Sequence, residues 1–140
     1  MREDAEEDDE SLRLAIQKLA RRVRGYRGDE LGDGQLSVLF QLDRVDGMSP
    51  ADLASGERVT RPSMNRTLNA LERRGLVARS AHPHDARRVT VRITDTGRAL
   101  LRETRRLRAQ WFRARYLALS PEEQEVLLRA APVLRKLADE

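Results

Sequence analysis

The sequence predicts a mainly α-helical chain that carries one small β-hairpin. Apolar residues recur at helical spacing along most of the 140 residues, and Ser, Thr and Pro stand where helices would begin. Only residues 77–93 hold short runs typical of strands, the second of them in strict apolar alternation. The length is that of one domain, and 39% hydrophobic with 36% charged residues is a normal composition for a soluble, helix-rich protein.

The N-terminal stretch changes character at Ser11. Residues 1–10 carry seven acids and one arginine, a net charge of −6, with little to bury, so we expect a disordered acidic tail there. Ser11 is a suitable N-cap for a first helix that ends near Gly25 and Gly28. The apolar stripe of this helix is Leu12, Ala15, Ile16, Leu19, Val23 and Tyr26.

Two further helices are predicted before residue 60. One spans residues 33–45. Ser49 is placed to cap a second, short helix, with Pro50 at its first position and Asp52 near its positive end. The residues of both helices that we expect to face the core are Leu36, Val38, Leu39, Phe40, Leu53 and Ala54.

A longer helix is predicted from Thr60 to about Arg74, with Thr60 as its N-cap and Gly75 as its stop. Pro62 lies in the first turn, where a missing N–H costs no hydrogen bond. The apolar stripe that must face a core is Met64, Leu68 and Leu71. A short helix, a turn and a long helix in this order form a helix-turn-helix.

The opposite face of this longer helix carries hydroxyl, amide and guanidinium groups. Its residues are Pro62, Ser63, Asn65, Arg66, Asn69 and Arg73. Such groups read base edges or hold phosphates in the major groove of DNA. The same composition also suits a solvated helix face, but the position after a short helix and a turn favours DNA contact.

Two short strands follow the helix. Residues 77–80 form one, residues 89–93 form the other, and AHPHDAR is the loop that joins them. Asp85 can pair with Arg87 and hold the long side chain extended. An arginine on a thin ribbon fits a narrow A·T-rich minor groove, so this hairpin would be the wing of a winged helix-turn-helix.

Two more helices are predicted at the C-terminus. Thr94 caps a long helix, and Ser120 with Pro121 begins another, which Pro132 should kink. Apolar residues of the long helix include Leu100, Leu101, Leu107 and Trp111. In a single chain the terminal helices have too few partners to bury their stripes. We therefore predict a dimer seam of Leu127, Ala131, Leu134 and Leu137, packed against the first helix and the end of the long one.

Several segments, in order, resemble the MarR family of bacterial transcription regulators. They are TRPSMNRTLNALERRGLV in the longer helix of the helix-turn-helix, DARR at the tip of the hairpin and VRITDTG at its close. The resemblance covers roughly residues 11–138. It implies a winged helix-turn-helix head over residues 33–94 and an intertwined homodimer held by residues 11–32 and 95–140.

The resemblance and the side-chain chemistry together predict the residues that contact double-stranded DNA. They are Thr60, Arg61, Pro62, Ser63, Asn65, Arg66, Asn69, Asp85, Arg87 and Arg88. Arg87 matches the wing arginine of the family, Asp85 its orienting acid, and Arg88 should meet the DNA backbone. Residues 47–94 hold nine arginines and four acids, a net charge of +5 that suits phosphates.

Two-fold symmetry would make the operator an inverted repeat. The half-sites should lie about one helical turn (~10 bp) apart on one face of the DNA. We expect a cytoplasmic repressor, because a dimer seated on an operator blocks polymerase without any further contact. Members of the family respond to small amphipathic or phenolic ligands between the dimerisation helices and the head. The resemblance therefore implies a small-molecule effector, with Tyr26, Phe40 and Trp111 as aromatic candidates, although core packing explains these residues equally well.

The sequence also excludes several classes of function. Without cysteine there is no disulfide, thiol catalysis or cysteine zinc site. His82, His84 and Asp85 are of zinc-ligand type but lack a fourth candidate nearby, so we expect no metal. No glycine motif for phosphate, no nucleophile beside a base and no window of ~18 apolar residues is present, so we expect no enzyme, no cofactor and no membrane span.

Two alternatives to a specific regulator remain open. One is a winged-helix protein that coats DNA without sequence preference, and the other is a winged helix that binds protein. The acidic residues 1–10 likewise have two interpretations: a solubilising arm, or a segment that competes with DNA for the basic surface.

Overall fold

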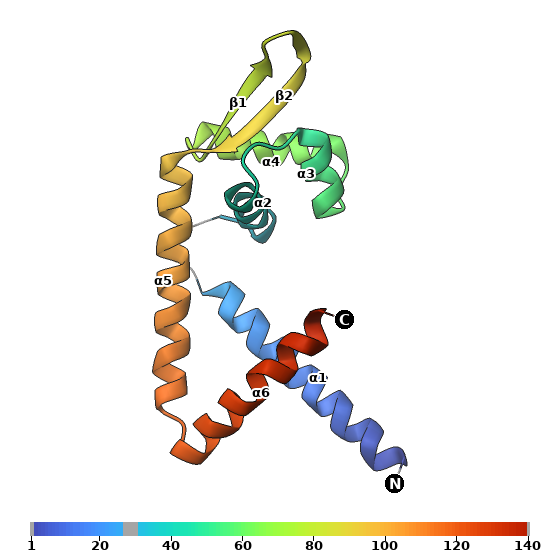
Figure 1. The fold of residues 1–140 in the computed structure, drawn as a ribbon, viewed down its shortest axis with the longest axis vertical. Helices are drawn as coiled ribbons and strands as arrows, with labels where there is room; N and C mark the ends of the chain where they lie inside the picture. Colours follow the sequence, from blue (N-terminus) through green and yellow to red (C-terminus); the bar gives the residue numbers. More distant parts are fainter. Residues whose placement is uncertain (1, 27–30, 140) are drawn as a thin grey trace. The chain divides into compact units, whose positions relative to one another are not determined.

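A computed structural model of the chain describes residues 2–26 and 31–139. The elements shown in Figure 1 are α1 (Arg2–Gly25), α2 (Asp33–Arg44), α3 (Pro50–Glu57), α4 (Arg61–Arg73), β1 (Val77–His82), β2 (Asp85–Ile93), α5 (Asp95–Leu117) and α6 (Pro121–Asp139). The chain divides into two compact units, residues 28–105 (the head unit) and residues 1–27 with 106–140 (the terminal unit). The predicted fold class, mainly α with one hairpin, is confirmed.

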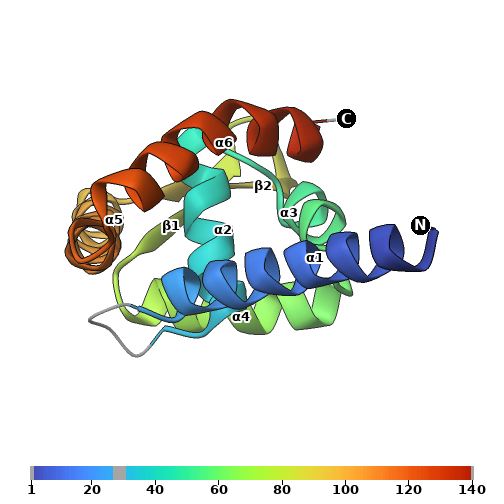
Figure 2. The same cartoon turned by 90° about the horizontal axis from the view of Figure 1, so that it is seen from below.

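The helices of the head unit begin and end where capping predicts. The Ser49 hydroxyl accepts a hydrogen bond from the Asp52 N–H (3.1 Å), and the Thr60 hydroxyl accepts one from the Ser63 N–H (3.2 Å). α4 stops before Gly75, whose φ of +71° is the left-handed conformation that ends many helices. α2 contacts both α3 and α4, which contact each other. Figure 2 shows these three helices from below.

The hairpin is longer than predicted. The antiparallel strands include the predicted residues 77–80 and 89–93, but β1 continues to His82 and β2 already begins at Asp85. The predicted AHPHDAR loop is therefore wrong, since only Pro83 and His84 remain as a turn. The register shifts beside His82: Ala81 pairs with Val89 and His82 with Asp85, so residues 86–88 lie between the two pairs as an irregularity of β2.

The residues before α3 join the wing to the helix-turn-helix. The Met48 N–H donates to the Val91 carbonyl at 3.0 Å, and the Val91 N–H donates to the Met48 carbonyl at 2.8 Å. Gly47 makes this close approach with a φ of +82°, and a Cβ there would lie 2.8 Å from Thr90 Cγ2. The wing is thus fixed to the loop that leads into α3.

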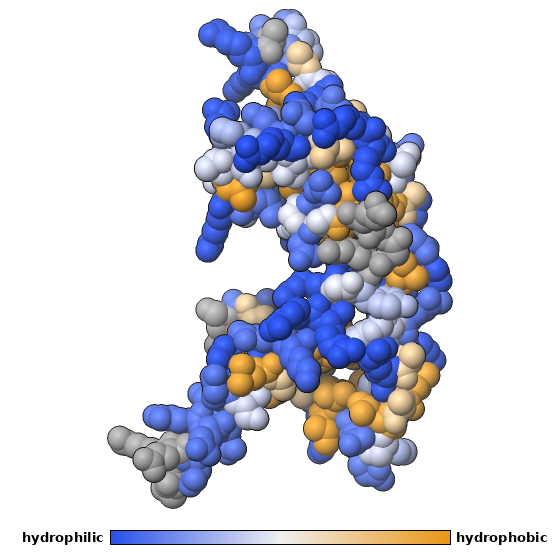
Figure 3. Space-filling view, turned by 180° about the vertical axis from the view of Figure 1, so that it is seen from behind, coloured by the Kyte–Doolittle hydropathy of each residue, from blue (hydrophilic) through white to orange (hydrophobic). Residues whose placement is uncertain are grey.

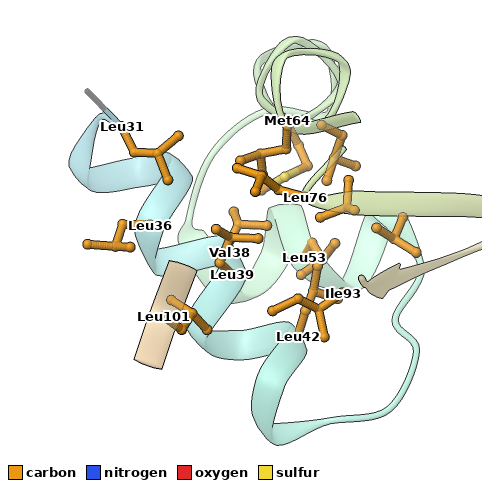
Figure 4. Packing of buried hydrophobic residues seen from close by; sticks show 14 of the residues in the cluster. Leu31, Leu36, Val38, Leu39, Leu42, Leu53, Met64, Leu76, Ile93 and Leu101 are labelled. Carbon is orange, nitrogen blue, oxygen red and sulfur yellow. The ribbon is translucent and has the colours of Figure 1, made fainter. Parts of the chain in front are cut away.

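One hydrophobic core holds the head unit together (Figure 4). It takes side chains from α2, α3, α4, the hairpin and the first half of α5. Its buried residues are Leu31, Leu36, Val38, Leu39, Leu42, Leu53, Ala54, Met64, Leu68, Leu71, Leu76, Val77, Val91, Ile93 and Leu101. The predicted core faces of α2, α3 and α4 are confirmed, with Phe40 only partly buried against this cluster.

This core also shows where the head ends. The predicted head, residues 33–94, lies inside the head unit, which extends to residues 28–105. Leu31 and Leu101 explain the larger extent, because both are at most 2% exposed and belong to the core.

Thr94 caps α5 as predicted: its hydroxyl accepts from the Gly97 N–H at 3.1 Å and donates to the Gly75 carbonyl at 2.6 Å.

The terminal unit combines α1, the second half of α5 and α6. The Arg108 guanidinium donates to the Arg24 carbonyl at 3.0 Å, and the Tyr26 and Trp111 rings lie 6.2 Å apart. α6 contains no buried residue. Large apolar side chains of this unit are exposed, and Figure 3 shows such a patch on its surface. They are Leu12, Leu14, Leu19, Phe112, Leu117, Val126, Leu127, Leu128, Val133, Leu134 and Leu137.

The start of α1 differs from the prediction. Residues 2–10 are the first turns of α1 where a disordered tail was expected, and Ser11 lies inside the helix and is not its N-cap. Acids in the first turns favour the positive end of a helix, and the segment has no Gly or Pro to interrupt it. Arg13 pairs with Glu10, one turn earlier, and lowers the pKa of that carboxyl through a hydrogen bond. Gly28 lies outside the described residues.

The last helix agrees with the predicted capping. The Ser120 hydroxyl accepts from the Glu123 N–H (3.1 Å), while the Glu123 carboxylate accepts from the Ser120 N–H (2.9 Å). α6 continues through Pro132 as one helix, and the kink there stays a prediction.

Candidate nucleic-acid interface

An open groove of about 790 Å³ lies between the wing and the N-terminal ends of α3 and α4, all within the head unit. Its lining residues are Ser49, Pro50, Ala51, Arg61, Pro62, Asn65, His82, Arg87, Arg88, Val89 and Thr90. The groove therefore brings together five of the predicted DNA-binding residues from two separate parts of the sequence. Thr60, Ser63, Arg66, Asn69 and Asp85 do not line it.

The N-terminal end of α4 supplies one wall of the groove. The Thr60 cap and Pro62 in the first turn set the direction in which the helix begins. Met64, Leu68 and Leu71 face the core, so Arg61, Pro62, Asn65 and Arg66 are left on the exposed side. The free N–H groups and the positive dipole end of such a helix favour an anion such as a DNA phosphate.

The wing supplies the opposite wall of the groove, and this wall carries a highly exposed cation. The side chain of Arg87 is 95% exposed. Its backbone N–H donates to Asp85 Oδ1 at 3.0 Å, and its Nε lies 3.5 Å from the same oxygen. Asp85 therefore orients Arg87 through backbone and side chain together, as predicted, and leaves the rest of the guanidinium free to approach a ligand.

Three polar lining residues outside the predicted DNA contacts add hydrogen-bonding capacity to the groove. Ser49 and Thr90 lie in the lining, as does His82, whose Nδ1 accepts a hydrogen bond from the His84 N–H at 3.2 Å. The sequence predicts Ser49 only as a helix cap and indicates His82 only as a residue of metal-ligand type. Their place in the groove depends on how the hairpin folds over α3, which no local pattern in the sequence reveals.

A second contact links α4 to the wing near its base. Arg79 of β1 donates from Nη2 to Asn69 Oδ1 at 2.9 Å, and its Nε lies 3.3 Å from Glu72 Oε2. Arg79 was counted in the sequence only as one positive charge. A helical spacing that puts Asn65, Asn69 and Glu72 on one side of α4 was the available signal, but their partner on β1 was not predictable from it.

The charge of this region suits a polyanion. Residues 47–94 carry nine arginines and four acids. Three of those acids are engaged within the fold: Glu57 with Ser37, Glu72 with Arg79, and Asp85 with Arg87. Arg61 and Arg88 border the groove with exposed side chains. The surface around the groove is therefore positive, as binding to phosphates requires.

The predicted ligand residues fall in different units. Tyr26, 44% exposed, and Trp111, 8% exposed, are neighbours in the terminal unit, where the Arg115 guanidinium lies 4.0 Å from the Trp111 ring centroid. Phe40 belongs to the head unit, and the Arg105 guanidinium lies 5.1 Å from its ring centroid. Each aromatic ring thus has a packing partner within its own unit.

Potential metal ligands are scattered over the described part of the chain. No three His, Cys, Asp or Glu side chains of residues 2–26 and 31–139 gather in a way that could hold a metal ion. None of the helices in these two ranges combines the length and the apolar character that crossing a membrane requires.

Comparison with known proteins gives consistent matches. A model of the MarR family matches residues 31–89, inside the head unit. An uncharacterized HTH-type transcriptional regulator of Mycobacterium leprae is 37% identical over 131 residues, which cover 92% of this chain and 91% of that protein.

Solved structures are similar over nearly the whole chain. A candidate transcriptional regulator from Pseudomonas aeruginosa has a TM-score of 0.82 and 34% identity, covering 96% of this chain and 95% of that one. A mutant of S. aureus MepR bound to an oligodeoxyribonucleotide has a TM-score of 0.72, with 94% and 96% of the two chains covered. At 22% identity this second likeness is one of fold alone.

Proposed function

The chain belongs to the MarR family of HTH-type transcriptional regulators, and from this premise we propose that it binds an inverted-repeat operator as a homodimer and represses transcription. Regulators of this family bind DNA. The observation that supports the proposal most is the groove in which the N-terminal end of α4 faces the arginines of the wing.

The geometry of the groove suggests how the head would meet a duplex. α4 presents Arg61, Asn65 and Arg66 on its exposed side, and such groups match base edges and phosphates of a major groove. Arg87 stands on the hairpin beside it, 95% exposed and held by Asp85. We expect this arginine to enter the adjacent minor groove, where a narrow A·T-rich stretch attracts a guanidinium. The remaining predicted contacts, Thr60, Pro62, Ser63, Asn69 and Arg88, would position the head on the backbone or beside the bases.

Exposed apolar side chains of the terminal unit support the homodimer. Leu127 is 41% exposed, Leu134 38% and Leu137 67%, and α6 buries nothing within one chain. α1 likewise exposes Leu12, Leu14 and Leu19. A soluble protein rarely leaves this many large apolar residues in water, so we propose that the terminal helices of a second copy cover them.

A two-fold dimer would place one head on each half of the operator. The half-sites should be inverted and about one helical turn (~10 bp) apart. Because the dimer would occupy the DNA that polymerase needs, repression follows without any contact to the transcription machinery.

A small amphipathic or phenolic effector is the second part of the proposal. The family supplies the expectation, and the aromatic residues Tyr26, Phe40 and Trp111 are the ones to test. Trp111 is the only tryptophan in the sequence, so the tryptophan fluorescence reports on this residue alone and should change when a ligand binds near it. Titration with a phenolic acid such as 4-hydroxybenzoate should quench Trp111 and release labelled DNA over the same concentration range, if this class of effector acts here.

Fluorescence anisotropy with competitor DNA tests the DNA-binding proposal. The purified protein is titrated onto labelled DNA from upstream of its own gene at two salt concentrations, with unrelated DNA in excess. A specific regulator should saturate at one dimer per inverted repeat and keep its site against competitor, with a preference of about 10³-fold or more. Equal displacement by any DNA would favour a DNA-coating protein, and no binding at low salt would favour a protein-binding winged helix.

A further inference from the structure

Asn69 is one of the predicted DNA-contacting residues, and its side chain is already engaged within the head unit. It is exposed on α4 and accepts a hydrogen bond at Oδ1 from Nη2 of Arg79 on β1, at 2.9 Å. A guanidinium has only donors, so the atom that faces it must be the amide oxygen and not the nitrogen. The orientation of this amide is therefore fixed by chemistry.

Arg79 is itself held in place from two further sides. Its Nε forms an ion pair with Glu72 Oε2 at 3.3 Å, and its Nη2 also lies 3.5 Å from the Asn65 carbonyl oxygen. Asn65, Asn69 and Glu72 are spaced by four and three residues, which places them along one side of α4. The Arg79 side chain is 27% exposed, about half the 52% of Arg92 on the same hairpin. The Arg79 side chain thus reaches from β1, at the base of the wing, to α4.

Building on the proposed DNA-binding function, we propose that Arg79 is a positioning residue that makes Asn69 a hydrogen-bond donor toward DNA. With Oδ1 turned to the guanidinium, the two Nδ2–H groups are the part of the amide left to meet a ligand. In the major groove such donors match the acceptors of guanine (N7 and O6) and thymine (O4), whereas adenine offers them N7 alone, beside its donor amino group.

The same arrangement disfavours adenine. An asparagine that reads adenine must accept from the N6 amino group while it donates to N7. A second lone pair of Oδ1 exists, but the N6–H donor would approach an oxygen already bound to a cationic donor, and the guanidinium would repel the partial positive charge on the N6 hydrogen. The contact between Arg79 and Asn69 would thus determine which base Asn69 selects, although Arg79 itself need not touch the DNA.

Selection of binding sites from a random duplex library tests this inference, because it requires no assumption about the operator sequence. The proteins compared are the parent, Asn69→Ala, Arg79→Met and the double variant. Asn69→Ala identifies the base pair that Asn69 reads, because the preference there disappears. At this base pair the parent should prefer guanine or thymine over adenine, and Arg79→Met should shift the preference toward adenine by about fivefold or more.

Two controls separate positioning from simpler roles. Arg92→Met removes another arginine of the same hairpin, one that pairs with Asp46 in the loop before α3. This variant should leave the base preference unchanged. If Arg79 merely contacted a phosphate, Arg79→Met would weaken binding equally on all sequences and reduce the salt dependence. In a double-mutant cycle Arg79→Met should change the preference at this base pair only while Asn69 is present.

The outcomes distinguish this inference from the function on which it rests. A parent protein that selects no sequence would overturn both. A parent that selects a sequence while Arg79→Met retains the parental preference at the Asn69 base pair would overturn the role of Arg79 alone. Loss of Arg79 could also loosen the whole fold, so NMR is used to separate a local change from a general one. The side-chain amide signals of Asn69 and the signals of the core are compared between the free parent and the free Arg79→Met protein. The amide signals should move in the variant while the core signals stay, and unmoved amide signals would contradict the contact itself.

Discussion

At the scale of the residue, Arg87 is the side chain on which the proposed contact between the wing and DNA depends. It is almost fully exposed, and Asp85 holds both its backbone N–H and its Nε. A restrained arginine loses less rotamer freedom when it binds than a free one would. Its place on the hairpin therefore favours a contact that a flexible surface arginine would make only weakly.

Replacing Arg87 with alanine should weaken DNA binding by about 1 kcal/mol or more, with the largest loss on operators that have A·T-rich flanks. Anisotropy titrations of flank variants at moderate salt measure this. Arg92→Ala on the same strand is the matched control, since it also removes one positive charge, but from an arginine that pairs with Asp46. Parental affinity of Arg87→Ala on every flank would show that the wing does not contact DNA.

Gly97, near the start of α5, lies so close to the backbone of the head unit that no larger side chain has room there. A Cβ at this position would overlap the Leu76 carbonyl oxygen and lie 2.7 Å from Ile93 Cγ1. Gly97→Ala should lower the free energy of unfolding by about 1–3 kcal/mol, as overpacking in a core does. Urea unfolding measures it. Gly34→Ala in α2 is the control, since a Cβ there meets nothing within 4 Å, and it should leave stability equal or higher.

At the scale of the element, Glu57 joins α3 to α2. Its carboxylate accepts a hydrogen bond from the Ser37 hydroxyl at 2.8 Å and another from the Gln41 amide. Gly56 lies close to this contact, because a Cβ there would be 2.9 Å from Gln41 Oε1. The angle between α2 and α3 is thus supported by a polar contact as well as by Leu39 and Leu53 of the core.

Glu57→Ala should therefore destabilise the head by about 1–3 kcal/mol, because the half-buried Ser37 and Gln41 lose a charged acceptor. Thermal unfolding and DNA affinity are measured together, and both should fall. Ser55→Ala, an exposed change in the same helix, should alter neither. An unchanged melting temperature for Glu57→Ala would mean that apolar packing alone fixes the two helices.

Local signals in the sequence predicted most elements, since each depends on neighbouring residues. Thr60 and Gly75 bound α4 as expected, and the stripe of Met64, Leu68 and Leu71 faces the core. The hairpin is longer than predicted because His82 pairs with Asp85 inside AHPHDAR, and the turn preference of this segment does not reveal that pair. The start of α1 was missed because high charge was weighed above helix propensity.

The site was predictable only in part for a related reason. The exposed face of α4 follows from helical periodicity, and the Asp85–Arg87 pair follows from proximity in the chain. The contact of Arg79 with Asn69 joins two elements, so no local pattern in either segment contains it. Ser49 and His82 enter the groove for the same reason.

At the scale of the whole molecule, the exposed apolar surface of the terminal unit supports the proposed dimer. Leu134→Asp should abolish the proposed dimer, because it would place a carboxylate in the seam with Leu127 and Leu137. Light scattering should give the monomer mass, and DNA affinity should fall to that of a single head. Lys136→Asp, a polar position on the same helix, is the control. A Leu134→Asp protein that stays dimeric would exclude α6 as the seam.

The assembled dimer would carry at least twice the +5 of residues 47–94 toward DNA. Affinity should therefore fall steeply between about 50 and 200 mM salt, by a factor of 10³ or more if six or more phosphates are contacted. A shallow salt dependence on the selected site would mean that few of these arginines meet the backbone.

Hydroxyl-radical footprinting on the selected duplex tests the central claim most directly, because it maps where each head meets DNA. Two protected patches on each strand, related by a two-fold axis and spaced by about one helical turn (~10 bp), are the predicted result. Arg87→Ala should remove the outer minor-groove protection and keep the rest. Uniform protection along the duplex, or a single patch without symmetry, would contradict a dimer that reads an inverted repeat through α4 and the wing.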